Sequence, residues 1–311
     1  MQLDPVLAAY LADQPDLVWD DDLDLAAVRA AENAESLAAP RLARPHEVRD
    51  TSVPGPPGAP DVRVRVYRPS PGPDLPVTLY LHGGGFVVGS LETHDNAARL
   101  LAEQARTLVV AVDYRLAPEH PYPAAVEDAF AAYRWCLEHA AELGGDPGRV
   151  AVAGDSAGGL LAAVLCFAAA ERGVRPPVFQ LLVYPSTGAG DTPSARAFAD
   201  ASGLRPAELE WYGRAFLGGA RPEDLPAYLR PARVPDLSGL PPAFVLTAEG
   251  DPLRDDGALY ARRLAEAGVP ARLHDSPGMV HGFLRFMHAV PAARAAAQPA
   301  FDALRAAFAA P

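Results

Sequence analysis

Residues 150–158 read Val-Ala-Val-Ala-Gly-Asp-Ser-Ala-Gly, and no other stretch says as much about the fold. The first four residues form an apolar run, which is typical of a strand buried on both faces. Residues 157–171 carry a helical pattern. Gly154 and Gly158 permit a tight turn between strand and helix, and such a turn lifts a side chain out of the sheet. The stretch therefore predicts a strand, a sharp turn that presents Ser156, and a helix.

The same alternation of apolar run and helical segment continues on both sides of this stretch. Further buried strands are predicted at residues 77–81, 108–112, 178–183 and 243–247, and another strand around Leu273. Helical patterns cover residues 124–142, 157–171, 255–267 and 292–309. Strands that alternate with helices are typical of an α/β fold with a mostly parallel central sheet flanked by helices.

Two regions depart from the alternation and divide the chain. Residues 186–233 are interrupted by Gly and Pro and contain several aromatic residues, so we interpret them as a cap insertion. Residues 1–45 contain two helical stretches, 6–11 and 23–37, and are predicted to be N-terminal cap helices. The core is then 46–185 and 234–311. Alternating Val and Arg over residues 62–67, after the Pro-rich turn at 54–60, predict an antiparallel edge strand.

Composition limits the classes of partner. The chain has 311 residues and a formal net charge of -12, and all of its strong cations are Arg, so no nucleic-acid-binding surface is expected. Cys136 and Cys166 lie in helical patterns and are expected to be buried hydrophobes without a disulfide. The N-terminal segment contains Asp4 and Asp13 and does not resemble a signal peptide. No apolar run is long enough to span a bilayer. We expect a soluble, cytoplasmic protein without stable membrane association.

A second glycine-rich stretch follows the strand predicted at residues 77–81. It reads His82-Gly83-Gly84-Gly85. Glycines let backbone amides point inward, and two or three preorganised donors stabilise the oxyanion that forms during acyl transfer. We expect the amides of Gly83, Gly84 and Ala157 to form such an oxyanion hole, with Ser156 as the nucleophile.

A serine nucleophile of this kind needs a base and an acid later in the chain. The candidate residues downstream are His274, His281, His288, Glu249, Asp251, Asp255 and Asp256. Asp251 follows the strand predicted at 243–247 most closely, where a loop can direct a carboxylate toward His281. Asp255 and Asp256 are expected to begin a helix, whose N-terminal dipole favours carboxylates.

Five blocks together resemble the bacterial hormone-sensitive-lipase-like esterases of the α/β-hydrolase superfamily. They are His82-Gly83-Gly84-Gly85-Phe86, Asp113-Tyr114-Arg115-Leu116-Ala117-Pro118-Glu119, Gly154-Asp155-Ser156-Ala157-Gly158-Gly159, Asp251-Pro252-Leu253-Arg254-Asp255 and His281-Gly282-Phe283. The resemblance implies the α/β-hydrolase fold with a helical cap and a catalytic triad of Ser156, Asp251 and His281. Its oxyanion donors fall on Gly83, Gly84 and Ala157. Leu160 is a departure, since similar proteins commonly have Asn there, and we expect it to alter only local helix contacts.

The remaining residues of these blocks receive supporting roles. His82 precedes the nucleophile in the chain, so it is expected to brace its loop by a hydrogen bond and not to act as the base. Asp155 and Glu119 are expected to support the site without reacting. Cap aromatics such as Trp211 fit either the core or the acyl pocket, and the sequence leaves both open.

These features predict a serine carboxylesterase that hydrolyses short-to-medium acyl esters through an acyl-enzyme. The expected partner is a small uncharged ester, and neither a metal nor an organic cofactor is implied. Lactones, amides or carbamates could use the same triad, and a non-catalytic ligand-binding protein could share the fold. The natural substrate and the oligomeric state, a homodimer included, stay open.

Overall fold

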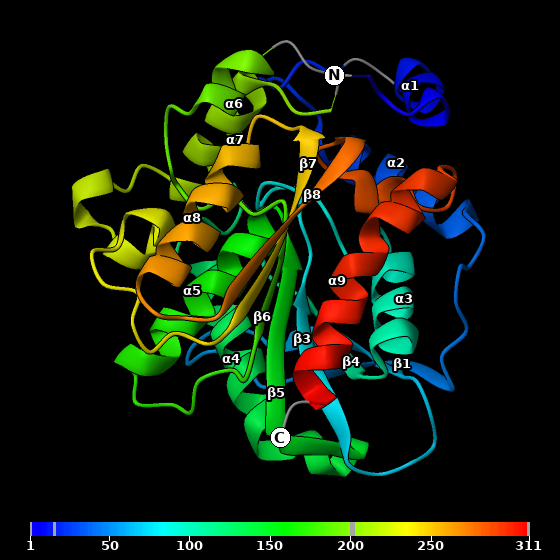
Figure 1. The fold of residues 1–311 in the computed structure, drawn as a ribbon, viewed down its shortest axis with the longest axis vertical. Coiled ribbons are helices and arrows are strands. Elements are labelled where there is room, and N and C mark those ends of the chain that lie inside the picture. Colours follow the sequence, from blue (N-terminus) through cyan, green and yellow to red (C-terminus); the bar gives the residue numbers. More distant parts are fainter. Residues whose placement is uncertain (1, 15–16, 200–202, 310–311) are drawn as a thin grey trace.

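The central sheet has eight strands in the order β1-β2-β4-β3-β5-β6-β7-β8 (Figure 1). The computed structural model describes residues 2–14, 17–199 and 203–309, apart from the side chain of Pro222. The strands are β1 (Glu47–Val53), β2 (Val62–Arg68), β3 (Leu75–Leu81), β4 (Leu108–Asp113), β5 (Gly145–Asp155), β6 (Gln180–Val183), β7 (Ala243–Gly250) and β8 (Ala271–Val280). All the buried strands that the sequence predicts are present.

The pairing is parallel from β4 to β8 and antiparallel at the other edge. The prediction of an edge strand over residues 62–67 is wrong in one respect. β2 is antiparallel, but β1 pairs with its outer side and is itself the edge. β1 reads Glu-Val-Arg-Asp-Thr-Ser-Val and is mostly solvent-exposed, so it lacks the apolar pattern that would have predicted it.

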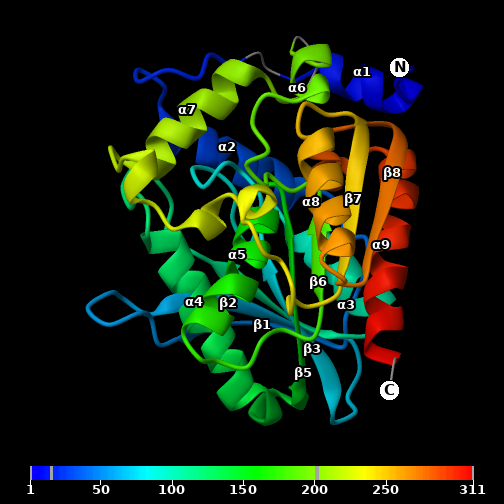
Figure 2. The same ribbon diagram turned by 60° about the vertical axis from the view of Figure 1, so that its left-hand side comes forward.

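Helices cover both faces of the sheet (Figures 1 and 2). One face packs on α4 (Ala124–His139), α5 (Ala157–Glu171) and α8 (Arg254–Glu266). The other packs on α3 (Asp95–Ala105), which the sequence analysis did not predict, and α9 (Pro291–Ala309). Short 3-10 turns occupy η1 (Ala140–Leu143), η2 (Pro222–Asp224), η3 (Ala227–Leu229), η4 (Pro231–Arg233) and η5 (Phe283–Phe286).

Four further helices lie together beyond the carboxyl ends of the parallel strands (Figure 2). They are α1 (Pro5–Ala12), α2 (Leu25–Ala38), α6 (Pro193–Ala197) and α7 (Pro206–Leu217). A separate apolar cluster joins Val28 of α2 and Trp211 of α7 to Val87 and Val88 in the loop after β3. The two segments predicted as cap thus share one small core above the sheet edge. Residues 1, 15–16 and 200–202 of these segments lie outside the described residues.

Cys136 and Cys166 are buried and free, as expected. Within the described ranges, no helix combines the length and apolar character needed to cross a membrane.

Candidate active site

Ser156 occupies the turn between β5 and α5 in a backbone conformation that few side chains adopt. Its φ is 52° and its ψ is −117°. The Ser156 amide donates to the carbonyl of Val183 on the next strand over 2.9 Å, which holds the turn against β6. A Cβ at Gly154 or Gly158 would collide with backbone atoms. The two glycines therefore set the turn, as the sequence predicts, and the serine hydroxyl is presented at its apex.

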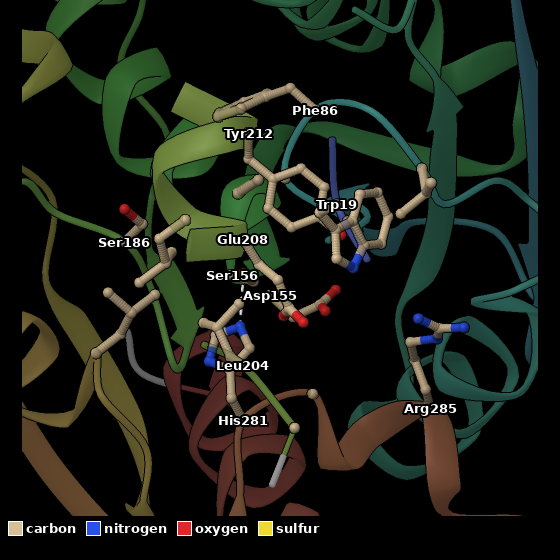
Figure 3. A pocket seen from close by; sticks show the side chains of 18 of the residues that line it. Trp19, Phe86, Asp155, Ser156, Ser186, Leu204, Glu208, Tyr212, His281 and Arg285 are labelled. Carbon is tan, nitrogen blue, oxygen red and sulfur yellow. Dashed lines mark hydrogen bonds between the residues drawn. The ribbon is translucent and has the colours of Figure 1, made fainter. Parts of the chain in front are cut away.

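Ser156, His281 and Asp251 form one hydrogen-bonded chain, shown in part in Figure 3. The Ser156 Oγ lies 2.8 Å from His281 Nε2. His281 Nδ1 lies 2.8 Å from Asp251 Oδ2. The other carboxylate oxygen of Asp251 accepts the Leu253 amide at 2.7 Å, and Asp251 is fully buried. Ser156, Asp251 and His281 directly follow β5, β7 and β8. They have the geometry of a nucleophile, an orienting acid and a base, respectively.

The two neighbouring carboxylates are directed elsewhere. Asp255 and Asp256 lie in the first turn of α8, as predicted. Asp255 accepts the amide of Ser194 over 2.9 Å, and Asp256 accepts the amide of Thr187 over 2.9 Å. Burial raises the pKa of Asp256 to about 6. Both carboxylates therefore anchor the cap insertion of residues 186–233, which we call the second cap segment, and do not contact His281.

The glycine loop corrects one predicted oxyanion donor. The amide of Gly83 donates to Asp155 Oδ1 over 3.1 Å, so its hydrogen is not available to a substrate. Gly84 and Gly85 instead line the cavity beside Ser156 and Ala157. Among the described residues, the amides of Gly84, Gly85 and Ala157 have no hydrogen-bond acceptor. Three consecutive glycines look alike in sequence, but in the structure the first binds the Asp155 carboxylate, and the other two have positive φ angles.

Asp155 connects the glycine loop to the nucleophile turn. Its buried carboxylate accepts the Tyr80 hydroxyl over 2.8 Å as well as the Gly83 amide, and it lies 3.3 Å from His94 Nε2. Burial by itself would raise the pKa of Asp155, but the facing His94 and the Tyr80 hydroxyl hold it at about 2. Asp155 is therefore a fixed negative charge that supports the site without facing the nucleophile hydroxyl, in agreement with its predicted role.

His82 and Glu119 also support the glycine loop. His82 Nδ1 lies 2.8 Å from the carbonyl of Gly83, and its ring stacks on Tyr114. Burial lowers the pKa of His82 to about 3, so this ring stays neutral. Glu119 supports the loop indirectly. It binds Arg29 of α2, and Arg29 donates to the carbonyl of Val87 over 2.8 Å. The predicted bracing role of His82 is confirmed.

A cavity of about 1070 Å³ opens above Ser156, and its lining contains an apolar and a charged group of residues, which we call arms. We define the leucine arm by Leu160, Phe216, Leu217, Leu225 and Leu229, from α5 and the second cap segment. We define the charged arm by Tyr10, Glu32, Glu35, Arg285 and His288, from α1, α2 and the chain after His281. In Figure 3, Ser186 and Arg285 lie on opposite sides of Ser156 and His281.

Two expectations about the cavity wall are settled by this arrangement. Trp211 is buried against Trp19 with ring centroids 5.5 Å apart, and it is a core residue. Among the described residues that line the cavity, its neighbour Tyr212 is present and Trp211 is not. Leu160 lines the leucine arm, so the expectation that this departure alters only helix contacts is wrong. A helical wheel does not reveal that this position of α5 faces a cavity.

The sequence of this chain is similar to a known family and to known proteins. A family model for the alpha/beta hydrolase fold matches residues 78–285. The chain is 44% identical over 308 residues to esterase LipI of Mycobacterium tuberculosis, covering 97% of this chain and 94% of that protein. It is 51% identical over 253 residues to carboxylesterase NlhH of the same organism, covering 80% and 79% of the two chains.

Solved structures agree with these sequence relatives. A hyperthermophilic esterase from the archaeon Pyrobaculum calidifontis superposes with a TM-score of 0.90 at 41% identity, covering 100% of both chains. The thermostable carboxylesterase EstE1 from a metagenomic library gives a TM-score of 0.86 at 42% identity, covering 93% of this chain and 99% of that chain.

Proposed function

Because the chain belongs to the hormone-sensitive-lipase-like esterases of the α/β-hydrolase superfamily and is a serine carboxylesterase, we propose that it cleaves small uncharged esters of short-to-medium acids. The observation that carries this proposal is the unbroken chain from Ser156 Oγ through His281 to Asp251, with both links at 2.8 Å. The chain ends in a cavity whose wall holds the unengaged amides of Gly84, Gly85 and Ala157.

Acylation begins when the Ser156 oxygen attacks the ester carbonyl carbon and His281 Nε2 takes its proton. Asp251 holds Nδ1–H, which leaves the lone pair of Nε2 directed at the serine. The carbonyl oxygen becomes an oxyanion, and the amides of Gly84, Gly85 and Ala157 are placed to donate to it. The tetrahedral intermediate then collapses, the bond to the alcohol oxygen breaks, and His281 returns the proton to that oxygen.

Deacylation repeats these steps with water. His281 takes a proton from water, the resulting hydroxide attacks the acyl carbon, and the carboxylic acid leaves as Ser156 recovers its proton. Apart from the ester and water, this cycle uses only groups of the chain.

We infer from the position of His281 which arm of the cavity holds which part of the ester. The leaving alcohol oxygen must lie near His281 Nε2 to receive its proton. We assign the alcohol to the charged arm, because two of its residues, Arg285 and His288, lie on the segment of chain that follows His281. The acid part of the ester then occupies the leucine arm, whose apolar walls suit an alkyl chain and exclude a charged one.

Acyl length is the first test of this assignment. We expect kcat/KM for p-nitrophenyl esters to rise from acetate to butyrate or hexanoate and to fall for dodecanoate and longer chains. Each methylene buried in the leucine arm contributes about 0.8 kcal/mol until the arm is full. The check is this series of rates, all measured at the same pH. Each ester is used below its critical micelle concentration. Faster hydrolysis of emulsified long-chain triglyceride than of butyrate esters would contradict it.

Proton transfer through His281 gives a second test. A protonated imidazole cannot accept the proton of Ser156, so kcat/KM should be lower at acidic than at alkaline pH. The measurement is the pH profile for a butyrate ester that is stable over the range used. A control melting curve at each pH shows that the fold persists. A flat profile from mildly acidic to alkaline pH would remove His281 as the base.

Lactones, amides and carbamates remain candidate substrates of the same triad, and a panel of these compounds alongside esters distinguishes them.

The proposed place of action is the cytoplasm, with the two unpaired cysteines as support.

A further inference from the structure

Phe86 follows the three glycines of the loop in a backbone conformation that its side chain disfavours. Its φ is 64°, next to Gly85 with a φ of 61°. A Cβ crowds the backbone in this left-handed region, so a phenylalanine keeps the conformation only where its surroundings enforce it. These surroundings bear on the Gly85 amide, which lies one residue earlier and is unengaged in the cavity of Ser156.

The second cap segment supplies part of these surroundings. Phe216 of α7 stacks on Phe86, with ring centroids 3.9 Å apart and an angle of 21° between the rings. The two residues are 8% and 7% exposed, respectively. The carbonyl of Phe86 also accepts the Ala117 amide over 2.8 Å. Phe86 is therefore held through its backbone by the chain after β4 and through its ring by the cap.

A second ring of the same helix lies on Gly85. A Cβ at Gly85 would overlap the ring of Tyr212, so this ring rests directly on the Gly85 backbone. Trp19 packs against Tyr212, with ring centroids 4.6 Å apart. Tyr212 and Phe216 are four positions apart, which puts them on one face of α7. That face meets two consecutive residues of the glycine loop.

Hydrogen bonds hold the earlier part of the loop but not Gly85. The Gly83 amide donates to Asp155 over 3.1 Å. The Gly84 carbonyl accepts two amides of the following residues over 3.0 and 2.9 Å. Within the part of the chain that the structure describes, Gly85 takes part in no hydrogen bond. Its position therefore depends on packing, in which the two rings of α7 take part.

Resting on the ester hydrolysis proposed above, we propose that Tyr212 and Phe216 are positioning residues of the oxyanion hole. Neither ring reacts. They hold Gly85 and Phe86 in place, and this sets the direction of the Gly85 amide. A donor must point at the site where the carbonyl oxygen becomes negative, and a displacement of about 1 Å can cost about 10²-fold in rate. In the view of Figure 3, Phe86 and Tyr212 lie across Ser156 from His281.

The first test replaces each ring by leucine and measures hydrolysis of p-nitrophenyl acetate. The acetyl group has a single methyl group, so its binding makes little use of the leucine arm. We expect Tyr212→Leu and Phe216→Leu each to lower kcat by about tenfold and to change KM by less than about threefold. The reason is that the loop binds the charged intermediate more strongly than the ester. Tyr212→Phe keeps the ring and should restore most of the loss.

A second readout follows the oxyanion itself. The Ser156 oxygen adds to the carbonyl carbon of 1,1,1-trifluoroacetone, His281 takes the serine proton, and the carbonyl oxygen becomes an anion. This adduct resembles the tetrahedral intermediate and needs the same amides. Its inhibition constant should rise in Tyr212→Leu and Phe216→Leu by about the factor by which kcat falls. A purely structural role of the rings would not produce this proportion.

Phe130→Leu is the matched control. Phe130 is a ring of α4 with 7% exposure, and it is not among the described residues that line the cavity. Its face packs on the Arg172 guanidinium at 4.3 Å. This variant loses a buried ring as Phe216→Leu does, so we expect a comparable fall in melting temperature without a fall in kcat. All rates are measured below the unfolding transition of the least stable variant.

The outcomes separate the two proposals. A wild-type protein that hydrolyses neither p-nitrophenyl acetate nor the butyrate would overturn the proposed esterase function itself. With an active wild-type protein, an unchanged kcat in the leucine variants would overturn only the positioning role. So would a loss that lies wholly in KM, an unchanged inhibition constant, or a Tyr212→Phe protein as impaired as Tyr212→Leu. If Tyr212→Leu does not fold, Phe216→Leu and the inhibitor decide.

Discussion

Replacing Ser156 by alanine should lower kcat for a butyrate ester by about 10⁵-fold or more and leave the protein folded. Loss of the nucleophile of a triad leaves only the catalysis that the oxyanion donors and substrate binding provide. The turn itself should persist, because Gly154 and Gly158 allow the close approach of backbone atoms and the serine hydroxyl does not bond to the backbone of the turn. The measurements are turnover, melting temperature and labelling by a fluorophosphonate probe.

The matched control for this substitution is Ser276→Ala. Ser276 is a buried serine of β8 outside the cavity, and its hydroxyl has no partner among the described residues. Its removal should leave turnover near the wild-type level. A Ser156→Ala protein with near wild-type turnover would remove Ser156 as the nucleophile. A wild-type protein that the probe does not label would favour a ligand-binding protein over an enzyme.

Asp251→Asn should lower turnover by about 10⁴-fold in a folded protein. The reason lies in the two partners of the carboxylate. Leu253 N–H occupies one oxygen at 2.7 Å, so an asparagine oxygen would stay there and its NH₂ group would face His281 Nδ1. Two donors cannot bond, and His281 would move its proton from Nδ1 to Nε2. The ring could then no longer accept the proton of Ser156.

Asp255→Asn and Asp256→Asn are the controls for this result. Their carboxylates bind backbone amides of the second cap segment, Ser194 and Thr187 respectively. Both variants should keep most of the turnover and change the melting temperature instead, since one hydrogen bond to a charged group contributes about 1.5 to 3 kcal/mol. An inactive, folded Asp255→Asn beside an active Asp251→Asn would show that the acid is assigned wrongly.

Much of the fold was predictable because local patterns encode it. Continuous apolar runs mark strands buried on both faces, and the helical pattern after Ala157 matches α5 at both ends. β1 and α3 escaped prediction for different reasons. β1 exposes both faces and shows no alternation. Residues 95–105 do carry a helical pattern, with Leu100, Leu101 and Ala105 buried, so α3 could have been predicted from the sequence.

The candidate triad was predictable from chain order, but the oxyanion loop was only partly so. Ser156, Asp251 and His281 each follow a predicted strand, and parallel strands bring their carboxyl ends to one edge of the sheet. The glycine loop gives no such guide. Gly83 and Gly85 are chemically identical, and the difference between them depends on Asp155, which is 72 residues from Gly83.

The sequence by itself determined the strands, the nucleophile turn and the order of the reacting residues, because backbone propensity and periodicity act over short distances along the chain. Only the tertiary structure decided which amides are free beside Ser156 and which charged residues line the cavity. Glu32 and Arg285 are 253 positions apart, and their pairing depends on how α2 packs against η5. Such contacts depend on which donors and acceptors are already used by distant partners, and no local pattern records that.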